Sequence, residues 1–176
     1  MTFTRMVAAA GAVLSLSVGA ALASDGVLPS SDSVFTKWGE AEGWTIYQDE
    51  TRQSCLAERV DDAGNVLQMG LTADHTLGYL GVFTQADIGL SGGKEKLLIA
   101  IDGDLYEGEA QQKSKHLADG YTGGYVLSND PKFISDVMKK YDMVVMPEHE
   151  GAFVINLEGT FKAIEESRKC NEEIGA

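Results

Sequence analysis

One serine of this chain lies in the pattern of a catalytic nucleophile. Gly89-Leu90-Ser91-Gly92-Gly93 matches Gly-x-Ser-x-Gly, in which a sharp turn between a strand and a helix exposes the serine hydroxyl. His116 or His149 would then act as the general base, because the serine needs a base within hydrogen-bonding distance. The residues that follow are charged and then apolar in the manner of a strand, not of a helix. We therefore interpret residues 89–93 as a loop and retain a small serine hydrolase as the alternative function.

Side chains that bind metal ions are scattered along the chain. His75, His116 and His149 have no second histidine or cysteine at the short spacings of a zinc site. Glu148-His149-Glu150 follows a proline and fits an exposed turn, and Asp102-Gly103-Asp104 lacks the further oxygen ligands of a calcium loop. We expect neither a metal site nor a cofactor.

A group of aromatic and small residues is the best candidate for a binding surface. Tyr121 and Tyr125 flank Gly123 and Gly124 in a segment that is otherwise typical of a strand. Aromatic side chains on a strand usually belong to the core. If the two tyrosines are exposed beside the glycines, however, they form an apolar surface of the kind that binds partners. These four residues are our candidate binding patch, on that condition.

The chain has two cysteines, Cys55 and Cys170, and we expect them to form a disulfide. Such a bond would join the last helix to an early strand, and the chain-entropy model gives a loop of this size roughly 4–5 kcal/mol of stabilisation. The two cysteines are far apart in sequence and do not form a Cys-x-x-Cys motif. A structural bond is therefore favoured over a redox pair.

Residues 1–23 have the features of a signal peptide. Arg5 precedes an apolar stretch, and Ala21-Leu22-Ala23 is a small-x-small cleavage site, which predicts a mature chain that starts at Ser24. The apolar stretch is shorter than the ~20 residues that a membrane-spanning helix needs, so we expect no span after cleavage. The short stretch and single arginine suit bacterial export, and we expect a periplasmic or secreted protein.

The formal net charge of the chain is −13. Contacts with phosphate groups need lysine and arginine, so this charge argues against binding to nucleic acid or to anionic lipid. The chain after residue 23 is long enough for one domain with its own core and too short for two.

Alternating apolar residues and turn signals predict many short strands and two late helices. Residues 24–42 are rich in Ser and Asp and predict a flexible lead, and residues 43–176 then form a single β-rich domain. Asp130 and Pro131 predict the start of one helix. We expect an α+β fold with a mainly antiparallel β sandwich or curled sheet and two late helices. The expected strands are 44–47, 55–60, 66–72, 77–83, 97–101, 105–110, 120–127, 143–146 and 153–157.

The last expected helix has one apolar side. Thr160 after Gly159 is expected to cap its start. At 100° per residue, the inward side carries Ala163, Ile164, Ser167, Cys170 and Ile174. Charged residues occupy the opposite side, so this helix is expected to lie on the sheet.

Four features of the chain occur in the same order in a known family. They are Trp44 on an early strand, Ile101-Asp102-Gly103, the helix and strand of residues 130–146, and Leu157-Glu158-Gly159 followed by Ala163. In this order and pattern, residues 44–170 resemble the secreted bacterial proteins of the invasion-associated locus B type.

The resemblance implies a β-rich, disulfide-bearing extracytoplasmic domain with no known catalytic residues. The chain departs from that family at Gln48, where the family usually carries a cysteine, and it has no cysteine in the middle of the domain. We therefore predict a non-catalytic secreted or periplasmic domain that binds or assists an unknown protein or envelope component.

Overall fold

The computed structural model describes residues 26–90, 95–111 and 116–175. The expected signal peptide and Ser91 lie outside these ranges. The elements in chain order are β1 (Phe35–Ala41), β2 (Trp44–Asp49), β3 (Ser54–Val60), β4 (Val66–Leu71), β5 (Gly78–Thr84), β6 (Glu95–Ile101), β7 (Asp104–Gln111), β8 (Thr122–Ser128), α1 (Pro131–Lys139), β9 (Asp142–Val145), β10 (Phe153–Asn156) and α2 (Thr160–Ile174).

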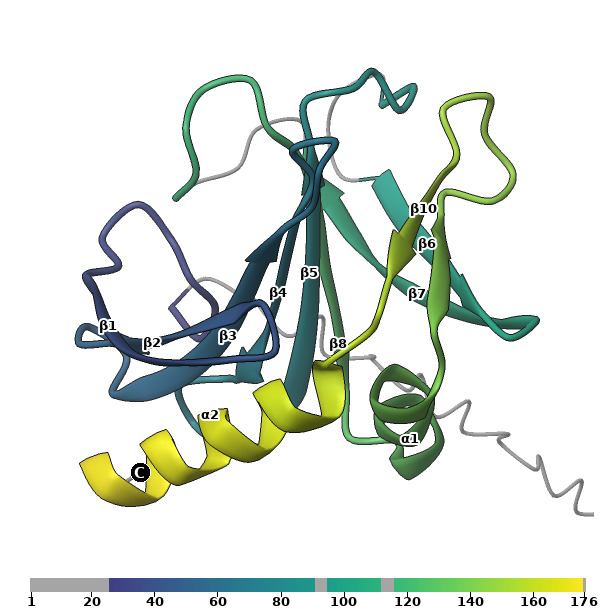
Figure 1. Ribbon diagram of the computed structural model, residues 1–176. Helices are drawn as coiled ribbons and strands as arrows, with labels where there is room; N and C mark the ends of the chain where they lie inside the picture. The colour runs from purple at the N-terminus through teal and green to yellow at the C-terminus, as the bar shows by residue number, and fades with distance from the viewer. Residues whose placement is uncertain (1–25, 91–94, 112–115, 176) are drawn as a thin grey trace, which may run out of the picture.

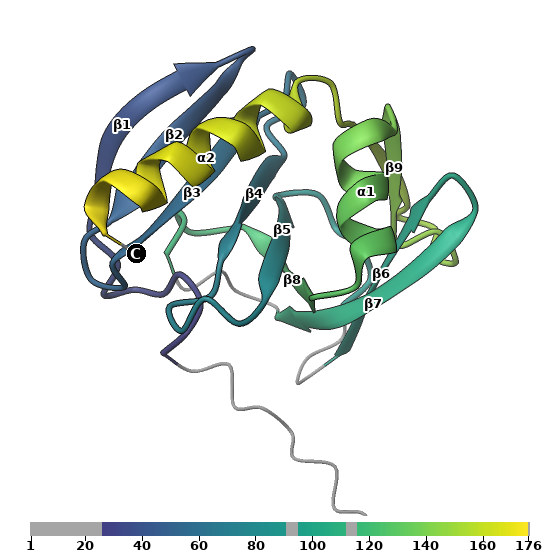
Figure 2. The same ribbon diagram turned by 90° about the horizontal axis from the view of Figure 1, so that it is seen from below.

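The strands form one ten-stranded antiparallel sheet in the order β1-β2-β3-β4-β5-β8-β7-β6-β9-β10. The sheet curls so that β1 and β10 lie on opposite sides of the molecule, and both helices lie at the same end (Figure 1). Viewed from that end, α2 crosses β1, β2 and β3, while α1 lies beside β9 (Figure 2). The expected α+β class with a curled antiparallel sheet and two late helices is confirmed.

Alternation along the strands separates two groups of buried side chains. The face of the sheet that meets the helices buries alternate residues of β2 to β5, such as Ile46, Ala57, Leu67 and Leu80. The other face buries a smaller, more aromatic cluster made of Leu28, Leu56, Val66, Tyr79, Phe83 and Tyr125. Strand β5 contributes to both clusters because it lies between β4 and β8, as its apolar residues on both faces predict.

The expected flexible lead of residues 24–42 is wrong for its second half, which forms β1. This edge strand pairs with β2, and its register shifts between Lys37 and Gly39. Polar and glycine residues interrupt the alternation there, so the segment has little strand signal of its own. Its position depends on distant contacts, since the indole Nε1 of Trp38 donates to Glu173 of α2 over 2.9 Å.

Helix α1 begins as its sequence predicts. The side chain of Asp130 accepts a hydrogen bond from the backbone N–H of Lys132 over 2.9 Å, and Pro131 occupies the first turn. Helix α2 begins differently, because its N-cap is Gly159 in the left-handed conformation, and no side chain caps it. The expected cap at Thr160 is therefore wrong. Its hydroxyl donates to the carbonyl oxygen of Val137 over 2.7 Å and joins the two helices.

The inward side of α2 is as expected. Ala163, Ser167 and Cys170 are buried, and Ile164 and Ile174 are half-buried. The disulfide between Cys55 and Cys170 is also present, with a Cα–Cα distance of 6.0 Å, and joins α2 to β3. Across the described part of the chain, no helix is both long and apolar enough to cross a membrane.

Candidate functional site

The tyrosines of the candidate binding patch do not form an exposed surface. Tyr125 is buried, and its hydroxyl donates to Oε1 of Gln68 over 2.9 Å. Its ring also meets the rings of Tyr79 and Phe83 edge-on. Tyr121 is half-buried, and its hydroxyl donates to the carbonyl oxygen of Gly64 over 2.9 Å. The predicted binding patch required exposed tyrosines, so this prediction is wrong. The two tyrosines pack against neighbouring residues instead.

The glycines of that patch allow three strands to approach closely. Gly123 and Gly124 are both buried on β8. A Cβ atom at Gly123 would overlap the carbonyl oxygen of Val82 on β5, and one at Gly124 would overlap that of Glu109 on β7. These residues are glycine because strands β5 and β7 occupy the space of a side chain.

His116 belongs to a polar cluster on the aromatic face of the sheet, in which Gln68 is buried and His116 and Glu58 are half-buried. Its Nε2 lies 2.9 Å from Oε1 of Gln68, and Nε2 of Gln68 donates to the carboxylate of Glu58 over 2.7 Å. Burial lowers the pKa of His116 to about 4 and raises the pKa of Glu58 above its usual value. The imidazole is therefore neutral at pH 7 and forms part of the packing beside Phe83.

His149 occupies a different environment from His116. It is exposed, and its Nδ1 lies 3.5 Å from the position that a Cβ atom on Gly89 would take. The structure thus brings His149 beside the start of the 89–93 loop, while Ser91 lies outside the described residues. Within the described ranges, no three His, Cys, Asp or Glu side chains gather as metal ligands would.

Asp102 and Asp104 serve the hairpin that the sequence predicts. Asp102 and Gly103 form the turn between β6 and β7, and both have positive φ. The carboxylate of Asp104 pairs with the ammonium of Lys132 over 2.5 Å, and Asp102 pairs with Lys140. These ion pairs hold the hairpin and α1 together.

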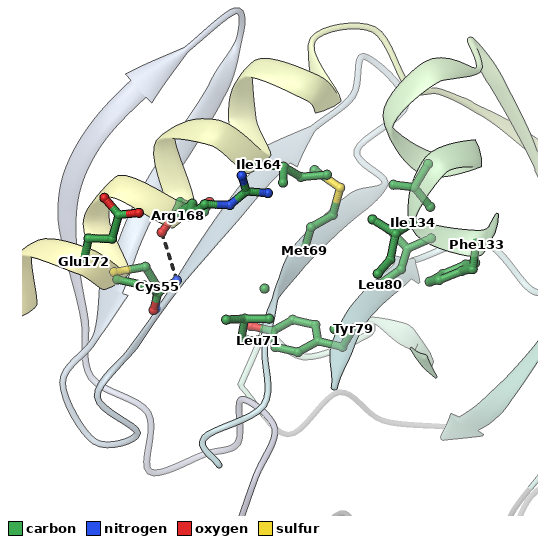
Figure 3. A pocket seen from close by; sticks show the side chains of 15 residues that line it. Cys55, Met69, Leu71, Tyr79, Leu80, Phe133, Ile134, Ile164, Arg168 and Glu172 are labelled. Carbon is green, nitrogen blue, oxygen red and sulfur yellow. Dashed lines mark hydrogen bonds between the residues drawn. The ribbon is translucent and has the colours of Figure 1, made fainter. Parts of the chain in front are cut away.

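A cavity of about 320 Å³ lies between α1 and α2 over strands β4 and β5, and we call it the interhelix pocket. Figure 3 shows its side chains, which come from both helices and from the strands beneath them. Its lining comprises Cys55, Met69, Gly70, Leu71, Gly78, Tyr79, Leu80, Phe133, Ile134, Val137, Ile164, Ser167, Arg168, Asn171 and Glu172.

The pocket exists because the two helices are attached to different parts of the sheet. The disulfide holds α2 against β3, while Phe133 of α1 packs on Tyr106 of β7 with ring centroids 4.7 Å apart. The helices meet where Thr160 bonds to Val137, at the start of α2. From there they diverge over β4 and β5 (Figure 2), and the pocket lies in the space between them.

Most of the pocket surface is apolar. Leu71 and Ile134 have exposed fractions of 36% and 39%, although both are large aliphatic residues. Met69 and Leu80, which also line the pocket, are buried. Exposed aliphatic side chains around a concave apolar space are typical of a ligand site.

Apart from Tyr79 of β5, the polar side chains of the pocket come from α2. Asn171 is fully used, since its Oδ1 accepts from the backbone N–H of Cys55 and its Nδ2 donates to the carbonyl oxygen of Ser167, both over 2.9 Å (Figure 3 shows the former). The Ser167 hydroxyl is buried and has no hydrogen-bond partner in the described part of the chain. Arg168 and Glu172 are exposed at the rim.

The sequence predicts that Ser167 and Ile164 face inward, but it does not predict the pocket. Its walls come from segments that are distant in sequence and meet only in the fold. Comparisons with protein-family models, with curated proteins and with solved structures find no match to this chain. The resemblance to the invasion-associated locus B proteins therefore stays a prediction.

Proposed function

We propose that this protein is a non-catalytic extracytoplasmic binding or accessory domain, and that the interhelix pocket is its ligand site. The observation that carries the proposal is the pocket itself, an apolar cavity of about 320 Å³ with a small number of polar groups. Ligand sites commonly measure ~300–1,000 Å³ and combine apolar walls with a few polar groups that orient the ligand.

The chemistry of the lining supports binding more than catalysis. Ser167 is the serine of the lining, and among the described residues no histidine lines the pocket to activate its hydroxyl. His116 lies in the polar cluster with Gln68 on the other face of the sheet. The disulfide supports an oxidising compartment, in which the ligand would be an envelope component or a molecule delivered to one.

Binding of an uncharged apolar dye such as Nile red tests the proposal. We expect the dye to bind the purified protein, and Ile134→Trp at the pocket to abolish that binding by filling the space. Leu105→Trp is the matched control, because Leu105 has an exposed fraction of 58% and does not line the pocket. Equal dye binding by both variants, or none by the unmodified protein, would refute the pocket as a ligand site.

A small serine hydrolase remains a second candidate because His149 lies beside Gly89. In that function Ser91 is the nucleophile and His149 its base. An esterase panel with the unmodified protein and Ser91→Ala separates the two functions. Hydrolysis that is lost in Ser91→Ala would support the enzyme, and no hydrolysis by either protein would support the binding domain.

A further inference from the structure

We infer that the ligand of the interhelix pocket is a small amphipathic carboxylate, whose apolar body fills the pocket and whose carboxylate pairs with Arg168. This inference rests on the proposed function and names the chemistry of its ligand. It follows from an arginine without an acidic partner, a buried hydroxyl without a partner, and the size of the cavity.

Arg168 differs from the two lysines of α2. Lys162 pairs with Glu165 over 2.7 Å, and Lys169 pairs with Glu166 over 2.6 Å. Arg168 makes no direct ion pair within the described residues, although the chain as a whole carries a net charge of −13. It acts on Glu165 only at longer range, and Glu165 is paired directly with Lys162. A guanidinium that is left unpaired in so acidic a protein is available for an external anion, and its planar fork suits a carboxylate.

The arginine side chain is directed toward the apolar part of the pocket. Figure 3 shows its guanidinium beside Ile164, while the carboxylate of Glu172 lies at the opposite end, beyond Cys55. The long stem of an arginine commonly lies along apolar surface with its charge at the edge. An apolar ligand in the pocket would thus have the Arg168 guanidinium near one end, and the Glu172 carboxylate would lie away from that end.

Ser167 supplies the second polar group. Its side chain lines the pocket one residue before Arg168, the residue is 6% exposed, and its Oγ has no partner in the described part of the chain. Buried hydroxyls are normally hydrogen-bonded, and a serine hydroxyl reorients easily, so a donor without a partner at the wall of a cavity can turn toward an acceptor that binds there. A carboxylate oxygen is such an acceptor, and the amide of Asn171 does not compete because both its groups are used.

The size of the cavity sets the size of the ligand. An apolar cavity of ~150 Å³ holds one benzene molecule, so a cavity of about 320 Å³ has space for roughly twelve non-hydrogen atoms. A ten-carbon carboxylate has that size. Decanoate is therefore the probe, and decanol is the uncharged control of the same chain length.

Isothermal titration calorimetry with both probes tests the inference. We expect the protein to bind decanoate more tightly than decanol, and added salt to reduce the difference. Arg168→Gln should weaken decanoate binding about fivefold and leave decanol binding unchanged, because the ion pair forms at a partly exposed site. Lys169→Gln is the matched control, since Lys169 is the next residue on α2 and does not line the pocket. Its affinity for decanoate should stay within about twofold.

The outcomes separate this inference from the proposed function. If decanol and decanoate bind equally and Arg168→Gln changes neither affinity, the inference of a carboxylate ligand is wrong, while the proposal of an apolar ligand site is supported. If neither probe binds, or if Ile134→Trp leaves the binding of both unchanged, the pocket is not a ligand site and the proposed function fails.

Discussion

His116 should make the folded state sensitive to acid. Its half-buried ring packs against Phe35, Phe83 and Tyr125, and its Nε2 lies 2.9 Å from Gln68. Burial lowers the pKa of His116 from 6.5 to about 4 in the folded protein, mainly because the charged imidazolium loses its hydration. Between these pH values the unfolded chain binds the proton and the folded chain does not. The free energy of unfolding therefore falls as the pH falls from about 6.5 toward 4.

The size of this effect follows from the two pKa values. The whole difference between the pKa values of the unfolded and folded states would change the free energy of unfolding by roughly 3 kcal/mol. Because solvent partly reaches the ring, we expect a change of about 2 kcal/mol. The neighbouring charges have opposed and smaller influences, because Asp49 raises this pKa and Arg52 lowers it. Glu58, whose pKa is raised by burial, acts in the opposite sense on stability, since the folded state binds its proton more readily.

Urea unfolding of the unmodified protein and of His116→Gln at several pH values between 7 and 4 measures the effect. Glutamine does not titrate, so the variant should lose about 2 kcal/mol less over this interval than the unmodified protein. The loss of ring packing lowers the stability of the variant at every pH and leaves this difference in slope intact. The contribution of Glu58 is common to both proteins. Parallel pH profiles would refute the burial of a neutral His116.

Three further predictions concern the frame of the fold. Thiol titration of the denatured, unreduced protein should find neither Cys55 nor Cys170 free, and their reduction should lower the free energy of unfolding by about 4 kcal/mol because it opens a loop of 115 residues. Two reactive thiols before reduction would exclude the bond. Gly124→Ala should cost about 3 kcal/mol in urea melts, since its Cβ would overlap the backbone of β7. Ile164→Ala should cost about 1–2 kcal/mol, because Ile164 is half-buried at the pocket, and Glu165→Ala less than about 0.5 kcal/mol. The opposite order in urea melts would mean that α2 packs through another face.

Local sequence patterns predict the strands and helices of this protein where each element has its own signal. Strands β2 to β8 carry alternating or continuous apolar residues, and Asp130 with Pro131 predicts the start of α1. Strand β1 lacks such a signal, because Lys37 and Gly39 interrupt its alternation. It is held by β2 and by the bond from Trp38 to α2, which are contacts that a local pattern does not contain.

The candidate binding patch fails for a related reason. Tyr125 and Gly124 would suit an exposed edge strand as well as a central one. Strand β8 is central, since it follows β7 in sequence but enters the sheet between β5 and β7. That placement buries the tyrosine and brings the backbone of both neighbours against the glycines. The order of strands in the sheet is a long-range property, and it decides whether the same residues form a surface or a core.

The periodicity of α2 predicts part of the pocket. The 100° spacing of α2 places Ser167 on the inward side, where a serine is expected to find a partner or to be replaced by an apolar residue. Whether Ser167 faces a packed neighbour or a cavity depends on the distance between α2 and α1. That distance is set by the disulfide at α2 and by the packing of Phe133 at α1. Arg168 lies at the border of the same side, four residues after Ile164, so its stem follows apolar surface while its charge reaches the rim. The sequence can therefore indicate two parts of this site. One is Ser167, a polar residue on the apolar side of α2, and the other is Arg168, a cation at the border of that side that makes no direct ion pair within the described residues.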